Sequence, residues 1–298
     1  MKKKIIVLSG GVSEEREISL KSGNAVAEAL NERWDVVQID PQDPDWLERV
    51  VAMRPDCVLN ALHGKMGEDG AVQKKLDDRL ITYTGADAAA SALCFDKVRC
   101  KKQLEDAGVL MARSYLWQQE RDCQLSLPVV VKPVASGSSV GVSIVRDASE
   151  FFAACVVASQ YGEVMIEQFI EGVDVCMPIV EGVDLLPIAI RPQAEFYDFH
   201  AKYEANNTIY EIGAGMSDSQ INACQVLARH IFKALGCTNW GRVDFICDEN
   251  GQLYFLEMNT IPGLTQSSLV PKSAAAVGID FTCLLEKIIS NKLATKSH

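Results

Sequence analysis

The feature that most constrains this chain is a pair of strand-like segments joined by a turn near its C-terminal end. The segments, 242–247 and 252–258, flank the strong turn formers Asp248-Glu249-Asn250-Gly251, so they predict an antiparallel hairpin. A loop with an even number of residues would place Arg242 opposite Glu257. A bulged, odd loop would shift the pairing and split the charged residues between the two faces of the hairpin.

An even loop gathers the charged and amide side chains of this hairpin on one face, because side chains alternate along a strand. That face would hold Arg242, Asp244, Glu257 and Asn259. The opposite, buried face would hold Val243, Phe245, Tyr254 and Leu256. Carboxylate and amide oxygens suit Mg²⁺, which binds one or two carboxylates together with substrate phosphates, and a neighbouring guanidinium could hold an anion. The alternative is a solvated hairpin with scattered charges.

A loop rich in serine and glycine is the second polar feature. The loop, Gly137-Ser138-Ser139-Val140-Gly141, allows close backbone approach to an anion, and Lys132 ends the predicted strand before it. A lysine there can hold a phosphate as a point charge. The loop also matches the G-x-S-x-G nucleophile elbow, but the 142–145 segment predicts a strand where that elbow needs a helix. A serine hydrolase and a flexible surface hairpin remain as alternatives.

Composition and charge narrow the class of protein. The chain has 298 residues, 48% of them hydrophobic and 23% charged, which is typical of a globular protein of two or three domains. A net charge of −11 without a basic stripe argues against nucleic acid as a partner. The first apolar run ends at Ser9-Gly10-Gly11, too early for a signal peptide, and no stretch approaches a membrane span. We therefore expect a cytoplasmic protein, in which the ten irregularly spaced cysteines are reduced and mostly buried.

The order of the predicted elements indicates an α/β fold. Strand-like segments at 4–8, 35–39 and 56–62 alternate with a helix, which indicates a parallel sheet whose ligands bind beyond the carboxyl ends of the strands. Glu15 and His63 lie in loops at such ends. Further helices are expected over 19–30, 88–108, 149–159, 219–235 and 273–293, and further strands over 127–132, 164–170, 174–180 and 185–191. A polar, irregular segment spans 193–215. Taken singly, Glu15 is explained by helix capping, His63 by a structural role and Lys97 by a solvated helix face.

Short motifs from about Lys4 to about Lys287 together resemble the D-alanine–D-alanine ligases of the ATP-grasp superfamily. The matching stretches are 10–19, 61–64, 83–85, 96–97, 137–141, 196–199, 201–203, 241–244, 259–263 and 268–271. The resemblance implies an N-terminal Rossmann-like domain with a parallel sheet, and ATP held between two antiparallel sheets. The expected division is a substrate-binding domain over 1–84, a central domain with the phosphate loop over 85–166, and a C-terminal domain with the metal site and a lid over 167–298.

The resemblance also implies an activity. ATP would drive peptide bond formation between two D-alanine molecules through a D-alanyl phosphate, for peptidoglycan precursors, in a cytoplasmic homodimer. Related alternatives are a ligase that joins D-alanine to another amino or hydroxy acid such as D-lactate, and a nucleotide-binding relative that has lost catalysis.

The resemblance assigns the nucleotide and metal contacts as follows. The ATP phosphates would be held by Lys97 and Lys132, with Lys202 also at the nucleotide. The adenine would lie against the hinge Glu167, Gln168, Phe169 and Ile170, and the ribose against Asp174. Two Mg²⁺ (or Mn²⁺) ions would be bound by Asp244, Glu257 and Asn259.

The resemblance assigns the amino acid contacts in the same way. The oxyanion hole would be formed by Arg242 and the Gly263 N–H. The first D-alanine would be bound by Glu15 and His63, and the carboxylate of the second by Ser268 and the Leu269 N–H. A hydrogen-bonded set that joins the three domains would consist of Glu15, Ser138 and Tyr203, with Lys202 and Tyr203 on a lid.

Three positions bear on specificity. In this family a tyrosine at Tyr203 goes with D-alanine rather than D-lactate as second substrate. Ala135-Ser136 stands where the family often has Arg-Glu, so the phosphate loop is expected to close differently. Asp174 stands where the family often has Glu, which is expected to shift the ribose contact.

Overall fold

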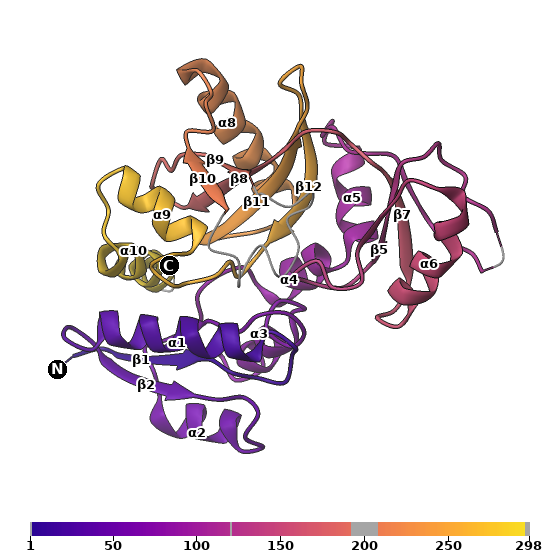
Figure 1. Ribbon diagram of the computed structural model, residues 1–298. Helices are drawn as coiled ribbons and strands as arrows, with labels where there is room; N and C mark the ends of the chain where they lie inside the picture. Colours follow the sequence, from indigo (N-terminus) through magenta and orange to yellow (C-terminus); the bar gives the residue numbers. More distant parts are fainter. Residues whose placement is uncertain (1, 120, 192–207, 296–298) are drawn as a thin grey trace.

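The strands of the protein form three separate sheets in the computed structural model, which describes residues 2–119, 121–191 and 208–295 (Figure 1). One sheet is parallel and two are antiparallel, which confirms the expected α/β class. The domain limits at 84/85 and 166/167 stay a prediction, and the second falls inside a strand of the central sheet.

The N-terminal part is a parallel sheet flanked by helices. Its elements are β1 (Lys4–Leu8), α1 (Arg16–Leu30), β2 (Asp35–Ile39), α2 (Trp46–Met53), β3 (Cys57–Asn60) and α3 (Ala71–Asp77). The sheet order is β2-β1-β3, and the apolar strand β1 is buried in its middle. The loops after β1 and β3 leave the same edge of the sheet, as predicted, and carry Glu15 and His63 to one cavity. The pattern missed α2 and α3, because helices of eight and seven residues carry little periodic signal.

The described residues of the central part form three α-helices, one short 3₁₀ helix and an antiparallel sheet of order β4-β7-β5-β6. Its elements are α4 (Ala88–Phe95), α5 (Lys97–Glu105), β4 (Ser114–Leu116), β5 (Val129–Pro133), β6 (Ser143–Val145), η1 (Ala148–Glu150), α6 (Phe151–Ser159) and β7 (Val164–Gln168). The predicted single helix over 88–108 is wrong. Asp96 is extended, and its carboxylate accepts the Arg99 N–H at 3.0 Å, which caps a new helix. Lys97 therefore opens α5 instead of lying inside a longer helix.

The C-terminal part is an antiparallel sheet of order β10-β9-β8-β11-β12. Its elements are β8 (Val173–Val180), β9 (Ile188–Arg191), β10 (Ile209–Ile212), α8 (Asp218–Ala234), β11 (Trp240–Cys247), β12 (Leu253–Asn259), α9 (Leu269–Ala276) and α10 (Phe281–Thr295). A capping box formed by Ser217 and Gln220 starts α8. The last helix, α10, returns to pack against α1 and β3 (Figure 1). The strand β10 lies within the segment expected to be irregular.

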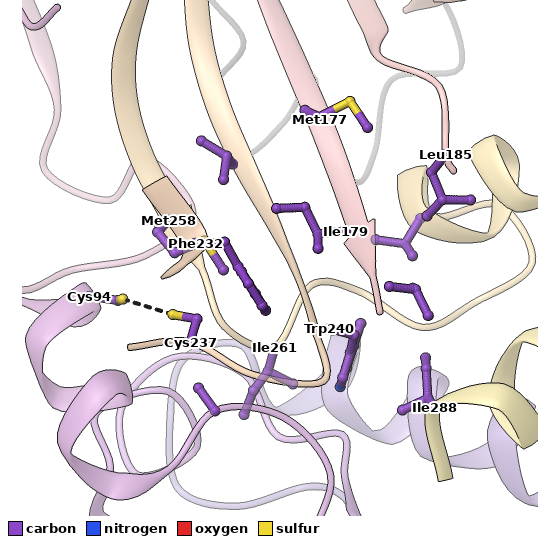
Figure 2. Close-up of a cluster of buried hydrophobic side chains, with 14 of the residues drawn as sticks. Cys94, Met177, Ile179, Leu185, Phe232, Cys237, Trp240, Met258, Ile261 and Ile288 are labelled. Atoms are coloured by element: carbon purple, nitrogen blue, oxygen red, sulfur yellow. Dashed lines mark hydrogen bonds between the residues drawn. The ribbon is translucent and has the colours of Figure 1, made fainter. Parts of the chain in front are cut away.

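The largest hydrophobic core runs through the parallel sheet, α4, the C-terminal sheet and α10. Trp240, Ile261 and Ile288 meet in it (Figure 2), so the first and last parts of the chain share one core. The thiols of Cys94 and Cys237 face each other there, with 3.6 Å between the sulfurs. Hydrogen bonding with Cys100 and Cys237, together with burial, raises the pKa of Cys94. All ten cysteines lie within the described residues as thiols outside any disulfide, and seven are buried, which confirms the expectation of mostly buried thiols.

Asn239 holds three distant segments together. Its side chain accepts the Gly85 N–H at 2.8 Å and donates to the Ile288 carbonyl at 2.9 Å, and its backbone lies in the left-handed region at φ 72°. Asn239→Ala removes both bonds and places an alanine where the left-handed conformation is unfavourable, so we expect it to lower the free energy of unfolding by about 3 kcal/mol. Equilibrium denaturation measures the change.

Asn250→Ala, in the exposed turn after β11, is the matched control and should change the free energy of unfolding by less than about 0.5 kcal/mol. An equal effect of the two substitutions would contradict the role of Asn239.

Candidate active site

The hairpin of β11 and β12 pairs Arg242 with Asn259 and Asp244 with Glu257. The expected pairing of Arg242 with Glu257 is therefore wrong. A bulge follows Asp244, where the pairing shifts by one residue, but it lies on the turn side of the charged residues. The four polar side chains share one face in spite of the bulge, because all four lie in the part of the hairpin that is farther from the turn than the bulge.

The bulge changes the buried face of the hairpin. Beyond it, Phe255 rather than Leu256 pairs opposite Phe245, so the alternation of side chains is reset. The buried residues are Val243, Phe245, Phe255 and Met258. The predicted burial of Tyr254 and Leu256 is wrong, since both are partly exposed and line a cavity.

Close polar contacts join the residues of the hairpin face. Arg242 donates two hydrogen bonds to Asp244, each 2.7 Å long, in a bidentate pair. The Asn259 amide nitrogen donates to Asp244 Oδ2 at 2.8 Å and lies 3.5 Å from Glu257 Oε1. Burial would lower the pKa of Arg242, but the Asp244 carboxylate outweighs it and the pKa is raised. The guanidinium is therefore charged at every accessible pH.

Lys97 connects this face to the Ser/Gly loop. From the first turn of α5 its ammonium donates to the Ser136 carbonyl at 2.7 Å and lies 3.7 Å from Glu257 Oε2. Ser138 and Ser139 both have left-handed backbones, at φ 49° and 60°, an arrangement that can turn successive N–H groups toward an anion. The Ser136 hydroxyl donates within the loop, to backbone carbonyls at 3.2 and 3.3 Å. The departure at Ser136 thus serves the loop's own backbone.

Ser138 joins the loop to the N-terminal part of the chain, because its hydroxyl donates to Glu15 Oε1. This contact was expected for Glu15 and Ser138, whereas Tyr203, its third expected member, lies outside the described residues, as does Lys202. The segment after the loop is the strand β6, which contradicts the strand-to-helix turn of a nucleophile elbow.

The first of two adjoining cavities lies between the central and C-terminal sheets. Its apolar walls include Val130, Ile144, Val175, Ile190, Phe245 and Leu256. The expected nucleotide residues on its lining are Lys97, Lys132, Glu167, Gln168, Phe169, Ile170 and Asp174. Glu167 is buried, and its two carboxylate oxygens lie 2.5 Å from the ammonium groups of Lys101 and Lys132. A cavity with apolar walls and a few cationic side chains has the character of a nucleotide site.

The second cavity lies between the N-terminal and C-terminal parts. Among the expected substrate and catalytic residues, those on its lining are Glu15, His63, Ser138, Arg242, Gly263, Ser268 and Leu269. Buried His63 has its Nε2 3.2 Å from the Ser22 hydroxyl and its Nδ1 3.9 Å from Glu68. The Ser268 hydroxyl accepts the Thr265 N–H at 3.0 Å, at the start of α9. Arg242 and Glu257 line both cavities, so the charged hairpin face is their common wall.

The sequence analysis missed several residues of these cavities. Ser22 and Glu68 surround His63, and Lys101 lies behind Glu167. The signal for Lys101 was available, because it follows Lys97 by one turn of α5. No local pattern marks Glu68, which reaches His63 only through the fold.

The comparisons with known proteins agree with this geometry. Residues 102–290 match the family model described as the C-terminus of D-ala D-ala ligases. This chain belongs to the D-alanine–D-alanine ligase family. A D-alanine–D-alanine ligase of Pseudomonas putida (strain GB-1) is 40% identical over 300 residues, which cover 98% of this chain and 94% of the relative. That of Geotalea uraniireducens (strain Rf4) is 43% identical over 295 residues, which cover 97% and 95%.

Solved structures of this ligase family share the whole fold. The D-alanine–D-alanine ligase of Bacillus anthracis complexed with ATP aligns over 99% of both chains, with a TM-score of 0.86 and 33% identity. The VanG D-Ala:D-Ser ligase of Enterococcus faecalis covers 98% of this chain and 100% of its own, with a TM-score of 0.83 and 29% identity. Within the described residues of this family member, no helix is long and apolar enough to span a membrane.

Proposed function

We propose that this protein joins two D-alanine molecules to D-alanyl-D-alanine, with conversion of ATP to ADP and phosphate. The carboxylate of the first D-alanine would attack the γ-phosphorus of ATP, which forms an acyl phosphate and releases ADP. The amine of the second would then attack the acyl carbon, lose a proton and expel phosphate. The observation that carries the proposal is that the charged hairpin face lines two adjoining cavities. The first has the apolar walls and lysines suited to a nucleotide, and the second has the polar groups suited to the ammonium and carboxylate of an amino acid.

ATP would lie in the first cavity. The apolar walls would enclose the adenine at the hinge 167–170, Asp174 would accept from the ribose hydroxyls, and the ammonium groups of Lys97 and Lys132 would pair with phosphate oxygens. Lys202, outside the described residues, would add a further cation. Support comes from the Bacillus anthracis relative, whose structure is a complex with ATP.

The donor set of the hairpin fits magnesium. Asp244, Glu257 and Asn259 supply two carboxylates and an amide, and the Asn259 amide nitrogen lies within 3.5 Å of an oxygen of each carboxylate. Mg²⁺ completes such a set with water and substrate phosphates. Among the described residues, no group of three or more His, Cys, Asp and Glu side chains is placed to hold a metal ion by itself. Bound Mg²⁺, or Mn²⁺, would neutralise negative charge on the phosphates. We propose that two such ions bind, as the resemblance to the ligase family implies.

The amino acids would lie in the second cavity. Glu15 would accept from the ammonium of the first D-alanine, and His63 would lie beside its carboxylate. Arg242 and the Gly263 N–H would stabilise the oxyanion of the tetrahedral intermediate, because fixed donors in a dry site are already oriented when charge develops. Ser268 and the Leu269 N–H would hold the second carboxylate at the start of α9. Tyr203, with Lys202 on a lid, would complete the set with Glu15 and Ser138.

Finer points of the proposal rest on the family. They are a cytoplasmic homodimer, a role in peptidoglycan precursor synthesis, and D-alanine as the second substrate, for which Tyr203 is the argument. A ligase that joins D-alanine to another acid is the second candidate, favoured by the similarity to a D-Ala:D-Ser ligase.

The deciding experiment measures phosphate release from ATP and Mg²⁺ with D-alanine, with L-alanine as control, and identifies products by mass spectrometry. We expect phosphate and the D-alanine dipeptide in equal amounts, and neither product with L-alanine. When D-serine or D-lactate competes with D-alanine, we expect less of the mixed product than of the D-alanine dipeptide. ATP binding without a dipeptide would favour the second candidate, and no ATP binding would overturn the proposal.

Asp244→Asn should lower turnover by at least about 100-fold and leave D-alanine affinity within a few-fold, because it removes a metal ligand and the partner of Arg242. The matched control Glu249→Gln removes one charge from the exposed turn of the same hairpin and should change neither. Steady-state ADP formation and D-alanine binding measure the two effects, and unchanged turnover would exclude Asp244 from the metal site.

Gly64→Ala should raise the KM for the first D-alanine by about tenfold, because the new Cβ would lie 2.6 Å from Glu15 Oε2 and displace that carboxylate. The backbone at Gly64 is left-handed at φ 67°, and the matched control Gly278→Ala has a similar φ of 81° with nothing within 4 Å. Both should lose about 1 kcal/mol of stability from backbone strain. Equal KM values in the two variants would contradict the assignment of Glu15.

A further inference from the structure

A buried cluster of three charges lies behind the wall of the nucleotide cavity. The Lys101 ammonium donates to Glu167 Oε1 at 2.5 Å and to the Ala112 carbonyl at 2.7 Å. The Lys132 ammonium donates to Glu167 Oε2 at 2.5 Å. The three side chains are at least nine-tenths buried, yet only Glu167 and Lys132 line the cavity. Lys101 does not line the cavity itself and contacts its wall through the Glu167 carboxylate and the Ala112 carbonyl.

The cluster carries a net charge of +1 when all three groups are ionised. Burial lowers the pKa of Lys101, and the charge of Glu167 opposes that shift. Burial would raise the pKa of Glu167, but the ammonium groups of Lys132 and Lys101 outweigh it, so the pKa is lowered. Glu167 is thus a carboxylate at neutral pH. A single carboxylate compensates one buried ammonium, so the cluster needs a second anion.

We propose that Lys101 is a positioning residue that keeps Lys132 available to the nucleotide phosphates. By holding one oxygen of Glu167, Lys101 divides the charge of that carboxylate between two cations, and the uncompensated positive charge faces the cavity at Lys132. Without Lys101, Lys132 and Glu167 would form a neutral pair with a weaker attraction for phosphate. The inference rests on the proposed ATP site.

A purely structural role for Lys101 predicts a different result. The Lys101 side chain also ties α5 to β7 and to Ala112 on the cavity wall, so its loss could loosen the adenine slot as a whole. A loosened slot would bind both adenosine and ADP more weakly. Loss of the positive charge would weaken the binding of ADP and leave the binding of adenosine unchanged, because adenosine has no phosphate.

The test is calorimetric binding of ADP and of adenosine, in the presence of Mg²⁺, to the full-length protein and to Lys101→Met. We expect the affinity for ADP to fall about tenfold or more and the affinity for adenosine to stay within twofold. Lys102→Met removes an exposed lysine from the next position of α5 and should bind both ligands as the parent does. Lys101→Arg, which keeps the charge, should restore most of the ADP affinity.

Lys132→Met supplies a second test. If Lys101 acts through Lys132, the losses of ADP binding free energy in Lys101→Met and Lys132→Met will together exceed the loss in the double variant that carries both substitutions. Should Lys101→Met not fold, Lys101→Gln keeps a hydrogen-bond donor without the charge and gives the same comparison.

Three results would overturn the inference and leave the proposed ATP site intact. They are an equal loss of affinity for adenosine and for ADP, an unchanged ADP affinity in both Lys101→Met and Lys101→Gln, and additive losses of ADP affinity in the double variant. If the parent protein itself bound no ADP, the proposed function would fall together with the inference.

Discussion

The bidentate pair between Arg242 and Asp244 is the interaction on which the arrangement of the site depends. The pairing of β11 with β12 sets the carboxylates of Asp244 and Glu257 directly opposite each other, where like charges repel. Arg242 on one side and Lys97, 3.7 Å from Glu257, on the other bring the formal charge of the group to zero. The same two cations connect the hairpin to both cavities and to the Ser/Gly loop, so the balance of these charges links three parts of the fold.

Placed cations, and not the overall field, make this acidic protein suitable for an anionic ligand. The chain carries a net charge of −11, yet the cavity between the central and C-terminal sheets is lined by Lys97, Lys132 and Arg242, and Lys101 lies behind its wall. Each of these cations has a carboxylate or carbonyl partner, which holds it in one geometry before any ligand arrives. Such fixed groups need little reorganisation when phosphate binds, and this is the main electrostatic contribution that a protein can make to phosphoryl transfer.

The sequence predicted the elements whose signals are local and misplaced those that depend on distant contacts. The strand β1, the helix α1 and the polar hairpin face follow from periodicity and from residue types that alternate, and all three are present. The bulge after Asp244 brings Phe255 instead of Leu256 opposite Phe245, a pairing between two strands that no local pattern marks. Glu68 reaches His63 only when two loops meet at one sheet edge. A single sequence cannot show such contacts, because residue spacing carries no information about them.

Selection of the second amino acid depends on side chains and not on the fold. A D-alanine–D-alanine ligase and a D-Ala:D-Ser ligase both superpose on nearly the whole chain, with TM-scores of 0.86 and 0.83. The start of α9, where Ser268 is fixed by Thr265, offers donors to a carboxylate, a group that D-alanine and D-serine share. A carboxylate anchor at the start of α9, as we propose, would therefore serve either substrate. Discrimination must come from residues near the methyl or hydroxymethyl group, where a polar partner would favour D-serine and an apolar wall D-alanine.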